Sequence, residues 1–134
     1  MLTIEQAKQI FSNDRFATKQ ADIIIEEISP DNAVCSMQIE SHHLNANNTV
    51  MGGAIFTLAD FCFAVAANTG DYLTVSIQSS ITFLRAATQG CLYAKTTPLK
   101  IGKSVCFYRI DITDENGNMI AEVNITGSRR AVTK

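Results

Sequence analysis

The sequence predicts an α+β domain in which a mainly antiparallel sheet wraps around one buried helix. Residues 51–68 read MGGAIFTLADFCFAVAAN, which is apolar on nearly every side when drawn as a helix. Two β-rich segments precede this helix and four follow it, and turn-forming residues separate them. Since an apolar helix must be covered by protein, we expect these strands to form a sheet around it.

The expected elements follow in chain order. A short helix at residues 2–11 has Thr3 as its N-cap and Gln6 three positions later, which is the pattern of a capping box. Asn116-Gly117 predicts a tight hairpin turn, and Pro98 predicts a strand end or a bulge. The long helix is expected at residues 54–67, and strands at 21–29, 33–40, 72–84, 91–99, 105–113 and 119–128.

Length and composition exclude several classes of protein. The 134 residues suit one domain, and 46% hydrophobic with 18% charged residues is typical of a globular chain. A net charge of -2 gives no electrostatic footprint for nucleic acid or for an anionic membrane. The four cysteines show neither disulfide nor metal-ligand spacing, so no metal is expected. The start of the chain does not have the pattern of a signal peptide, which predicts a cytoplasmic protein.

One carboxylate, Asp60, interrupts the apolar helix. It makes a membrane span improbable, and no Lys or Arg stands three or four residues away to neutralise it. A buried carboxylate without a partner should have a raised pKa, as acids in functional sites often do. A solvated or capping Asp60 is the alternative. At 100° per residue the Asp60 side of the helix carries Gly53, Thr57, Ala64 and Ala67, flanked by Phe56 and Phe63. The core side carries Ile55, Leu58, Cys62 and Val65.

The helix begins with Gly52 and Gly53, whose backbone amides are candidates for the second part of a site that includes Asp60. The first amides of a helix have no intrahelical acceptor, and two glycines let a ligand oxygen approach them, as in an oxyanion hole. A flexible helix start is the alternative reading. Asp60 lies eight residues beyond Gly52, or ~12 Å along the axis. Because a reacting atom must lie ~3 Å from both groups, they would have to come from different subunits of at least a dimer.

These residues carry a family resemblance. The segment HLNANNTVMGGAIFTLADFCFAVAANT resembles the signature of hotdog-fold acyl-CoA thioesterases of the phenylacetyl-CoA thioesterase-like (PaaI-type) branch. The resemblance rests on Asn45, Gly52, Gly53, Leu58 and Asp60, and element order agrees along nearly the whole chain. It implies a hotdog fold, a curved sheet of about six strands around the long helix. It also implies homotetramers built from dimers, and hydrolysis of an acyl-CoA without a cofactor.

The resemblance also implies roles for single residues. Asp60 would be the nucleophile or the general base, and the Gly52 amide of the other subunit would polarise the thioester carbonyl. Asn45 would orient the substrate or water, and Ser76 would lie near the carboxylate. The substrate would also contact Gly53, Met51 and Phe56.

Two positions depart from the family pattern. Met51 stands where a His is usual, and Asn48 stands where a Gly is usual. Methionine cannot replace the hydrogen bond of a histidine, so we expect a lower turnover or an acyl group suited to an apolar lining. The missing His also argues against a hotdog dehydratase or hydratase. His42 and His43 are expected to be structural.

The phosphates of coenzyme A need local cations. Candidates are Arg85, Lys100, Lys103, Arg129 and Arg130, with Gly102 permitting a close backbone approach. A single cation of this kind is more often plain solvated surface, so the expectation is only that the group together supplies the nucleotide site.

The sequence leaves the acyl group open between aromatic and medium-chain. It also leaves a rival function, a non-catalytic module that binds or senses acyl-CoA on the same fold. A carboxylate in the helix favours the enzyme, because a binding module would not need it.

Overall fold

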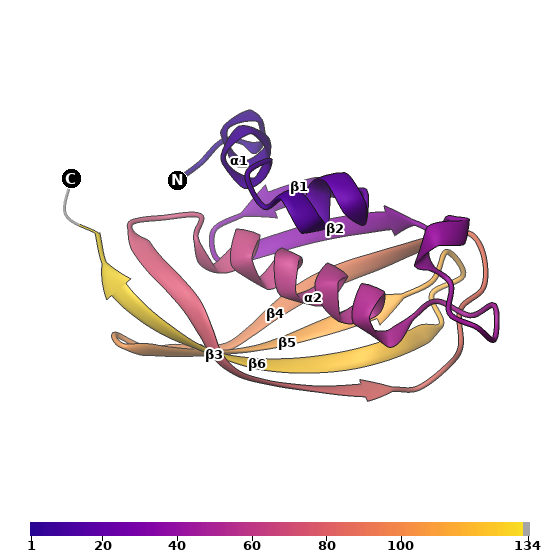
Figure 1. Cartoon of the computed structure of the whole chain (residues 1–134). Coiled ribbons are helices and arrows are strands. Elements are labelled where there is room, and N and C mark those ends of the chain that lie inside the picture. The colour runs from indigo at the N-terminus through magenta and orange to yellow at the C-terminus, as the bar shows by residue number, and fades with distance from the viewer. Residues whose placement is uncertain (133–134) are drawn as a thin grey trace.

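The computed structural model describes residues 1–132 and shows six antiparallel strands curving around one helix (Figure 1). The sheet has the strand order β1-β2-β4-β5-β6-β3, and α2 lies along its concave side. This confirms the predicted fold class. The elements are α1 (Ile4–Phe11), η1 (Phe16–Gln20), β1 (Ile23–Ser29), β2 (Asn32–Gln38), η2 (Ser41–His43), α2 (Gly52–Ala67), β3 (Tyr72–Phe83), β4 (Cys91–Ile101), β5 (Val105–Thr113) and β6 (Met119–Ala131).

The local signals in the sequence have their expected structural effects. Thr3 and Gln6 form the capping box, with the Gln6 amide donating to Thr3 Oγ1 at 3.1 Å and the Thr3 amide donating to Gln6 Oε1 at 2.9 Å. The β4–β5 register shifts between Pro98 and Lys100, which is the expected bulge. Gly117 has a φ of 81° in the β5–β6 turn, a conformation that favours glycine.

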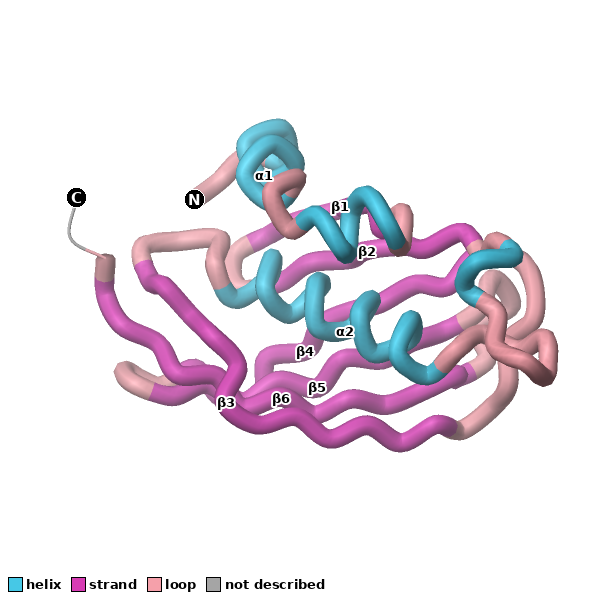
Figure 2. Tube along the Cα trace, viewed as in Figure 1, coloured by secondary structure: helices cyan, strands magenta, loops and turns pink. Residues whose placement is uncertain are grey.

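Two short helices were not expected from the sequence. Phe16–Gln20 forms one turn of π-helix before β1, and Ser41–His43 forms a 3₁₀ turn in the loop before α2 (Figure 2). The long helix begins at Gly52, two residues earlier than expected, so both glycines of the pair are helical.

The core lies between α2 and the sheet. The side of α2 predicted to face the core is buried, with Leu58, Cys62 and Val65 fully enclosed. One prediction for this helix was wrong: Phe63 does not flank Asp60 but packs edge-on against Tyr108, with ring centroids 5.3 Å apart. Tyr108 in turn donates its hydroxyl to the Asp31 carbonyl at 2.7 Å. Within residues 1–132, no helix has the length and apolarity needed to cross a membrane.

The packing around Gly127 on β6 leaves no room for a side chain. A Cβ there would lie 2.9 Å from Cys106 Sγ, Phe63 Cζ and Thr74 Cγ2 alike. We expect Gly127→Ala to lower the free energy of unfolding by about 1–3 kcal/mol through overpacking, measured by urea denaturation. Gly70→Ala is the matched control, because a Cβ at Gly70 meets nothing within 4 Å. Equal stability of the two variants would contradict this account of the packing.

Candidate active site

The Asp60 carboxylate lies in the wall of a cavity of about 440 Å³. The side chain is partly buried, and it has no hydrogen bond or ion pair to any described residue. Desolvation raises the pKa of this carboxyl above its ordinary value, and the nearby Asp14 carboxylate raises it further. The direction agrees with the sequence-based expectation. The lining residues are Asp14, Arg15, Phe16, Ala17, Phe56, Thr57, Asp60, Phe61 and Ala64.

Four of the nine residues that line this cavity belong to a segment that was not expected at the site from the sequence. Residues 14–17, which lead from α1 into η1, face the Asp60 side of α2 across this cavity. Their contact with α2 joins positions about 40 or more residues apart in the chain, and hydrophobic periodicity does not predict contacts at that separation. The prediction of which residues share the Asp60 side of the helix is only partly confirmed. Thr57 and Ala64 line the cavity, whereas Ala67 is buried outside it.

The start of α2 presents two free backbone amides. The Met51 amide donates to the His43 carbonyl at 2.8 Å, whereas the Gly52 and Gly53 amides have no acceptor among the described residues. A Cβ on Gly52 would lie 2.9 Å from Phe83 Cζ, so only glycine lets this ring pack against the helix start without a shift. Because the dipole of α2 adds to these donors, the position suits a developing negative charge.

Asp60 and Gly52 lie in different cavities of the chain. Gly52 opens into a second cavity of about 510 Å³, which it shares with Phe83 and Arg85 but not with Asp60. One chain therefore does not bring the carboxylate and the candidate oxyanion donors together. This separation agrees with the distance argument made from the sequence.

Met51 caps this helix start without making a side-chain hydrogen bond. Its side chain is 56% exposed, and its terminal methyl lies 3.2 Å from the position a Cβ on Gly53 would take. The position that carries a His in the family pattern is therefore an exposed, apolar side chain beside the Cα of Gly53.

The loop before α2 explains the other departure from the family pattern. Asn48 has a φ of 59°, a left-handed conformation that glycine adopts most readily and asparagine adopts more often than most other residues. The side chain of Asn45 holds the same loop, since its Oδ1 accepts from the Asn47 amide at 2.9 Å and its Nδ2 donates to Thr49 Oγ1 at 3.0 Å. In this structure Asn45 therefore shapes the loop, and its predicted contact with substrate stays a prediction.

His43 is a structural residue, as expected. Its ring is buried, with Nδ1 accepting from the Glu40 amide at 2.9 Å and Nε2 donating to the Ala21 carbonyl at 2.8 Å. His42 is exposed and lies 3.5 Å from Asp22. Ser76 is exposed on β3, next to the bulge that separates it from Gln78, and does not line the Asp60 cavity.

The predicted cations do not form one cluster within a chain. Lys100, Lys103 and Arg130 are exposed near the β4–β5 turn and the end of β6, whereas Arg85 lines the cavity at the start of α2, the opposite end of the sheet (Figure 1). Arg129 Nη1 donates to the Gly102 carbonyl at 2.7 Å, and its guanidinium stacks 3.9 Å from the centre of the Tyr72 ring.

Gly102 has a different role from the predicted one. A Cβ at this position would lie 2.8 Å from the Val105 carbonyl oxygen, to which the Gly102 amide donates at 2.9 Å. The close backbone approach is thus needed by the β4–β5 turn itself.

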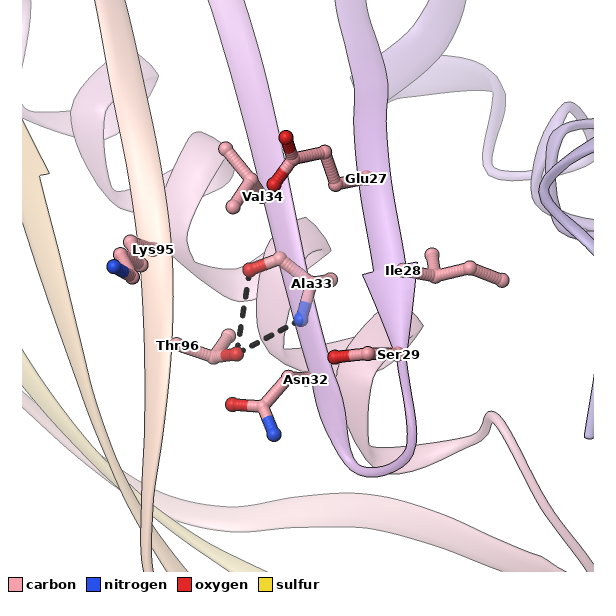
Figure 3. A pocket seen from close by; sticks show the side chains of 8 residues that line it. All are labelled: Glu27, Ile28, Ser29, Asn32, Ala33, Val34, Lys95 and Thr96. Carbon is pink, nitrogen blue, oxygen red and sulfur yellow. Dashed lines mark hydrogen bonds between the residues drawn. The ribbon is translucent and has the colours of Figure 1, made fainter.

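A further pocket of about 390 Å³ is lined by the β1–β2 hairpin and by Lys95 and Thr96 of the neighbouring β4 (Figure 3). Thr96 Oγ1 accepts from the Ala33 amide at 2.9 Å and donates to the Ala33 carbonyl at 3.3 Å, which continues the β2–β4 pairing beyond its last backbone bonds. Neither Asp60 nor Gly52 lines this pocket. The candidate chemistry therefore belongs to the two cavities along α2.

A curved sheet around an apolar helix defines a hotdog fold, and here the helix carries one carboxylate and a free Gly-Gly start. Residues 47–121 match the family described as the thioesterase superfamily, a span that holds both the helix start and Asp60. The chain belongs to this superfamily and to its PaaI-like branch. Its class is a hydrolase acting on thioester bonds.

Individual relatives support this placement. The chain is 32% identical over 120 residues to a putative esterase of Archaeoglobus fulgidus, covering 88% of this chain and 77% of that protein. It is 30% identical over 118 residues to the acyl-coenzyme A thioesterase PaaI of Escherichia coli, covering 87% and 84%. The fold is similar to that of a thioesterase from Haemophilus influenzae, with a TM-score of 0.88, 21% identity, and 100% and 94% of the two chains covered.

Proposed function

We propose that the protein hydrolyses an acyl-CoA thioester to the free acid and coenzyme A, with Asp60 as the acting carboxylate. The observation that carries this proposal is the unpartnered Asp60 side chain in an apolar-walled cavity, with a raised pKa. A desolvated carboxylate is more basic than one in water, which suits it to proton abstraction. The name of the E. coli relative supports coenzyme A as the thiol part of the substrate.

The chemistry needs one proton acceptor and one site for negative charge. As general base, Asp60 takes a proton from water while the water oxygen bonds to the thioester carbon. As nucleophile, Asp60 bonds to that carbon itself, and water then cleaves the resulting anhydride. In both routes the carbonyl oxygen gains negative charge, the Gly52 amide donates to it, and the C–S bond breaks to release the CoA thiolate.

This mechanism requires a second subunit, because Asp60 and Gly52 of one chain face different cavities. Strand β3 supports such an assembly. It is a 12-residue edge strand that pairs with β6 on one side and with no strand of residues 1–132 on the other, and Leu73, Val75 and Ile77 are exposed along it. Long apolar edges of this kind pair with another strand. A dimer through β3, which pairs again into a tetramer, is the assembly we propose.

A panel of acyl-CoA thioesters tests the function. We expect the wild-type protein to release free thiol from aromatic acyl-CoAs, medium-chain acyl-CoAs or both, measured with a thiol-reactive chromophore. The exposed cations at the two ends of the sheet would hold the phosphates, so free coenzyme A should inhibit competitively. Binding of acyl-CoA without any thiol release would contradict the enzyme and favour the binding or sensing module.

The pH dependence of the reaction should report the environment of Asp60. The carboxylate form is the active one, so kcat/KM is expected to fall as the pH drops through the raised pKa of Asp60. The charged groups that line the cavity with it are Asp14 and Arg15. Asp14→Asn removes one cause of the raised pKa and should move the acid limb of the profile to lower pH. Glu115→Gln, in the exposed β5–β6 turn, should leave it in place. An acid limb that moves upward in Asp14→Asn would contradict the assignment.

A further inference from the structure

Phe16 is a large aromatic side chain that the fold leaves outside the core. It is 67% exposed, yet it lines the same cavity as Asp60. The other aromatic walls are held by packing: Phe61 is buried, with its ring edge-on to Phe11 at 6.0 Å between centroids, and Phe56 packs against the core. Phe16 thus forms the outer wall of the cavity.

The backbone around Phe16 is fixed in an uncommon conformation. The Ala21 amide donates to the Phe16 carbonyl at 2.9 Å, which closes a π-helical turn. Before it, the Asp14 carbonyl accepts from both the amide and the hydroxyl of Thr18, each at 3.0 Å. π-Helical turns are rare and are often found at functional sites. Bonds on both sides of Phe16 therefore hold its Cα beside the cavity.

The cavity has the size and lining for an apolar acyl group. An apolar cavity of roughly 150 Å³ already holds a benzene ring, and the Asp60 cavity is about 440 Å³. Phe16, Phe56, Ala17 and Ala64 supply apolar surface, and the charged lining groups are two carboxylates, Asp14 and Asp60, against one cation, Arg15, which leaves an excess of negative charge. The negative charge disfavours the phosphates of coenzyme A here, so the acyl end of the substrate is the part that fits.

We propose that Phe16 is a specificity-determining residue, whose ring closes the acyl subsite beside Asp60 and favours planar aromatic acyl groups over flexible alkyl chains. An aromatic pair gains energy from ring geometry beyond its buried area, which a flexible chain does not. This inference rests on the proposed function.

The test compares Phe16→Ala and Phe16→Leu with wild type on phenylacetyl-CoA, octanoyl-CoA and acetyl-CoA. We expect the ratio of kcat/KM for phenylacetyl-CoA to that for acetyl-CoA to fall ~10-fold in Phe16→Ala. Phe16→Leu keeps apolar bulk, so it should lose the preference for the aromatic group over octanoyl while it keeps octanoyl turnover. Phe107→Ala is the matched control, since Phe107 is 41% exposed on β5 and does not line this cavity.

Binding of a non-hydrolysable thioether of phenylacetyl-CoA separates this inference from the proposed function. Weaker binding by Phe16→Ala, with wild-type binding by Phe107→Ala, supports the subsite even if no thioester is hydrolysed. Unchanged thioether affinity and unchanged ratios in Phe16→Ala would overturn the role of Phe16 and leave thioester hydrolysis intact.

Discussion

Asp60→Asn is expected to lower kcat for acyl-CoA hydrolysis by roughly 10²–10⁴-fold. Asparagine has nearly the same shape as aspartate, but its amide can neither accept the proton of water nor attack the thioester carbon. The substitution also removes an unpartnered, partly desolvated charge from α2. Free-thiol release under saturating acyl-CoA measures the effect.

The stability of this variant provides the control. Because burying an unpaired carboxylate costs free energy, Asp60→Asn should unfold at the same urea concentration as wild type or a higher one. A fall in kcat with unchanged assembly and stability assigns the loss to chemistry. Wild-type turnover by a folded Asp60→Asn protein would place the acting base elsewhere.

Gly52→Pro is expected to lower kcat by roughly 10²–10³-fold, because proline removes the amide that donates to the oxyanion. The backbone tolerates the change. Gly52 is the first residue of α2, where proline is favoured, and Met51 before it has φ -60° and ψ 136°, the extended conformation that a following proline requires. The helix should therefore form, as circular dichroism can check.

Gly52→Ala separates loss of the amide from steric effects. Both substitutions add a Cβ 2.9 Å from Phe83 Cζ, the far end of an exposed ring that can move aside. Only proline removes the N–H group. We expect Gly52→Ala to retain most of the activity that Gly52→Pro loses. Equal losses in the two variants would assign the effect to the Phe83 contact and contradict an oxyanion role for the amide.

The sequence predicted the parts of this fold that depend on local patterns. The apolar helix, the six strands, the Thr3 capping box and the Pro98 bulge each follow from residue type and spacing over a few positions, and all are present. The direction of the Asp60 pKa shift was also predictable, because the sequence places this carboxylate in an apolar helix, where it is desolvated, with no cation within one helical turn.

Features that depend on distant contacts could not be predicted in this way. The wall of the Asp60 cavity formed by residues 14–17 and the packing of Phe83 on Gly52 join segments tens of residues apart. The prediction that Phe63 flanks Asp60 was wrong because the angle of a residue around the helix does not show how far the curved sheet extends around that helix. The ring of Phe63 instead packs against Tyr108 on β5. The cations were predicted to form one phosphate site because of their charge alone. In the fold Arg85 lies at the end of the sheet near the start of α2, whereas Lys103 lies at the other end, in the β4–β5 turn.

Subunit complementation tests the central claim, that Asp60 of one subunit acts with Gly52 of another. Asp60→Asn and Gly52→Pro proteins are mixed in equal amounts, exchanged through mild denaturation, and assayed for thiol release. If the site forms across the interface, each mixed dimer carries one intact site, and the mixture recovers about one quarter of wild-type activity. If each subunit carries its own complete site, the mixture stays as inactive as its two components, and the account is contradicted.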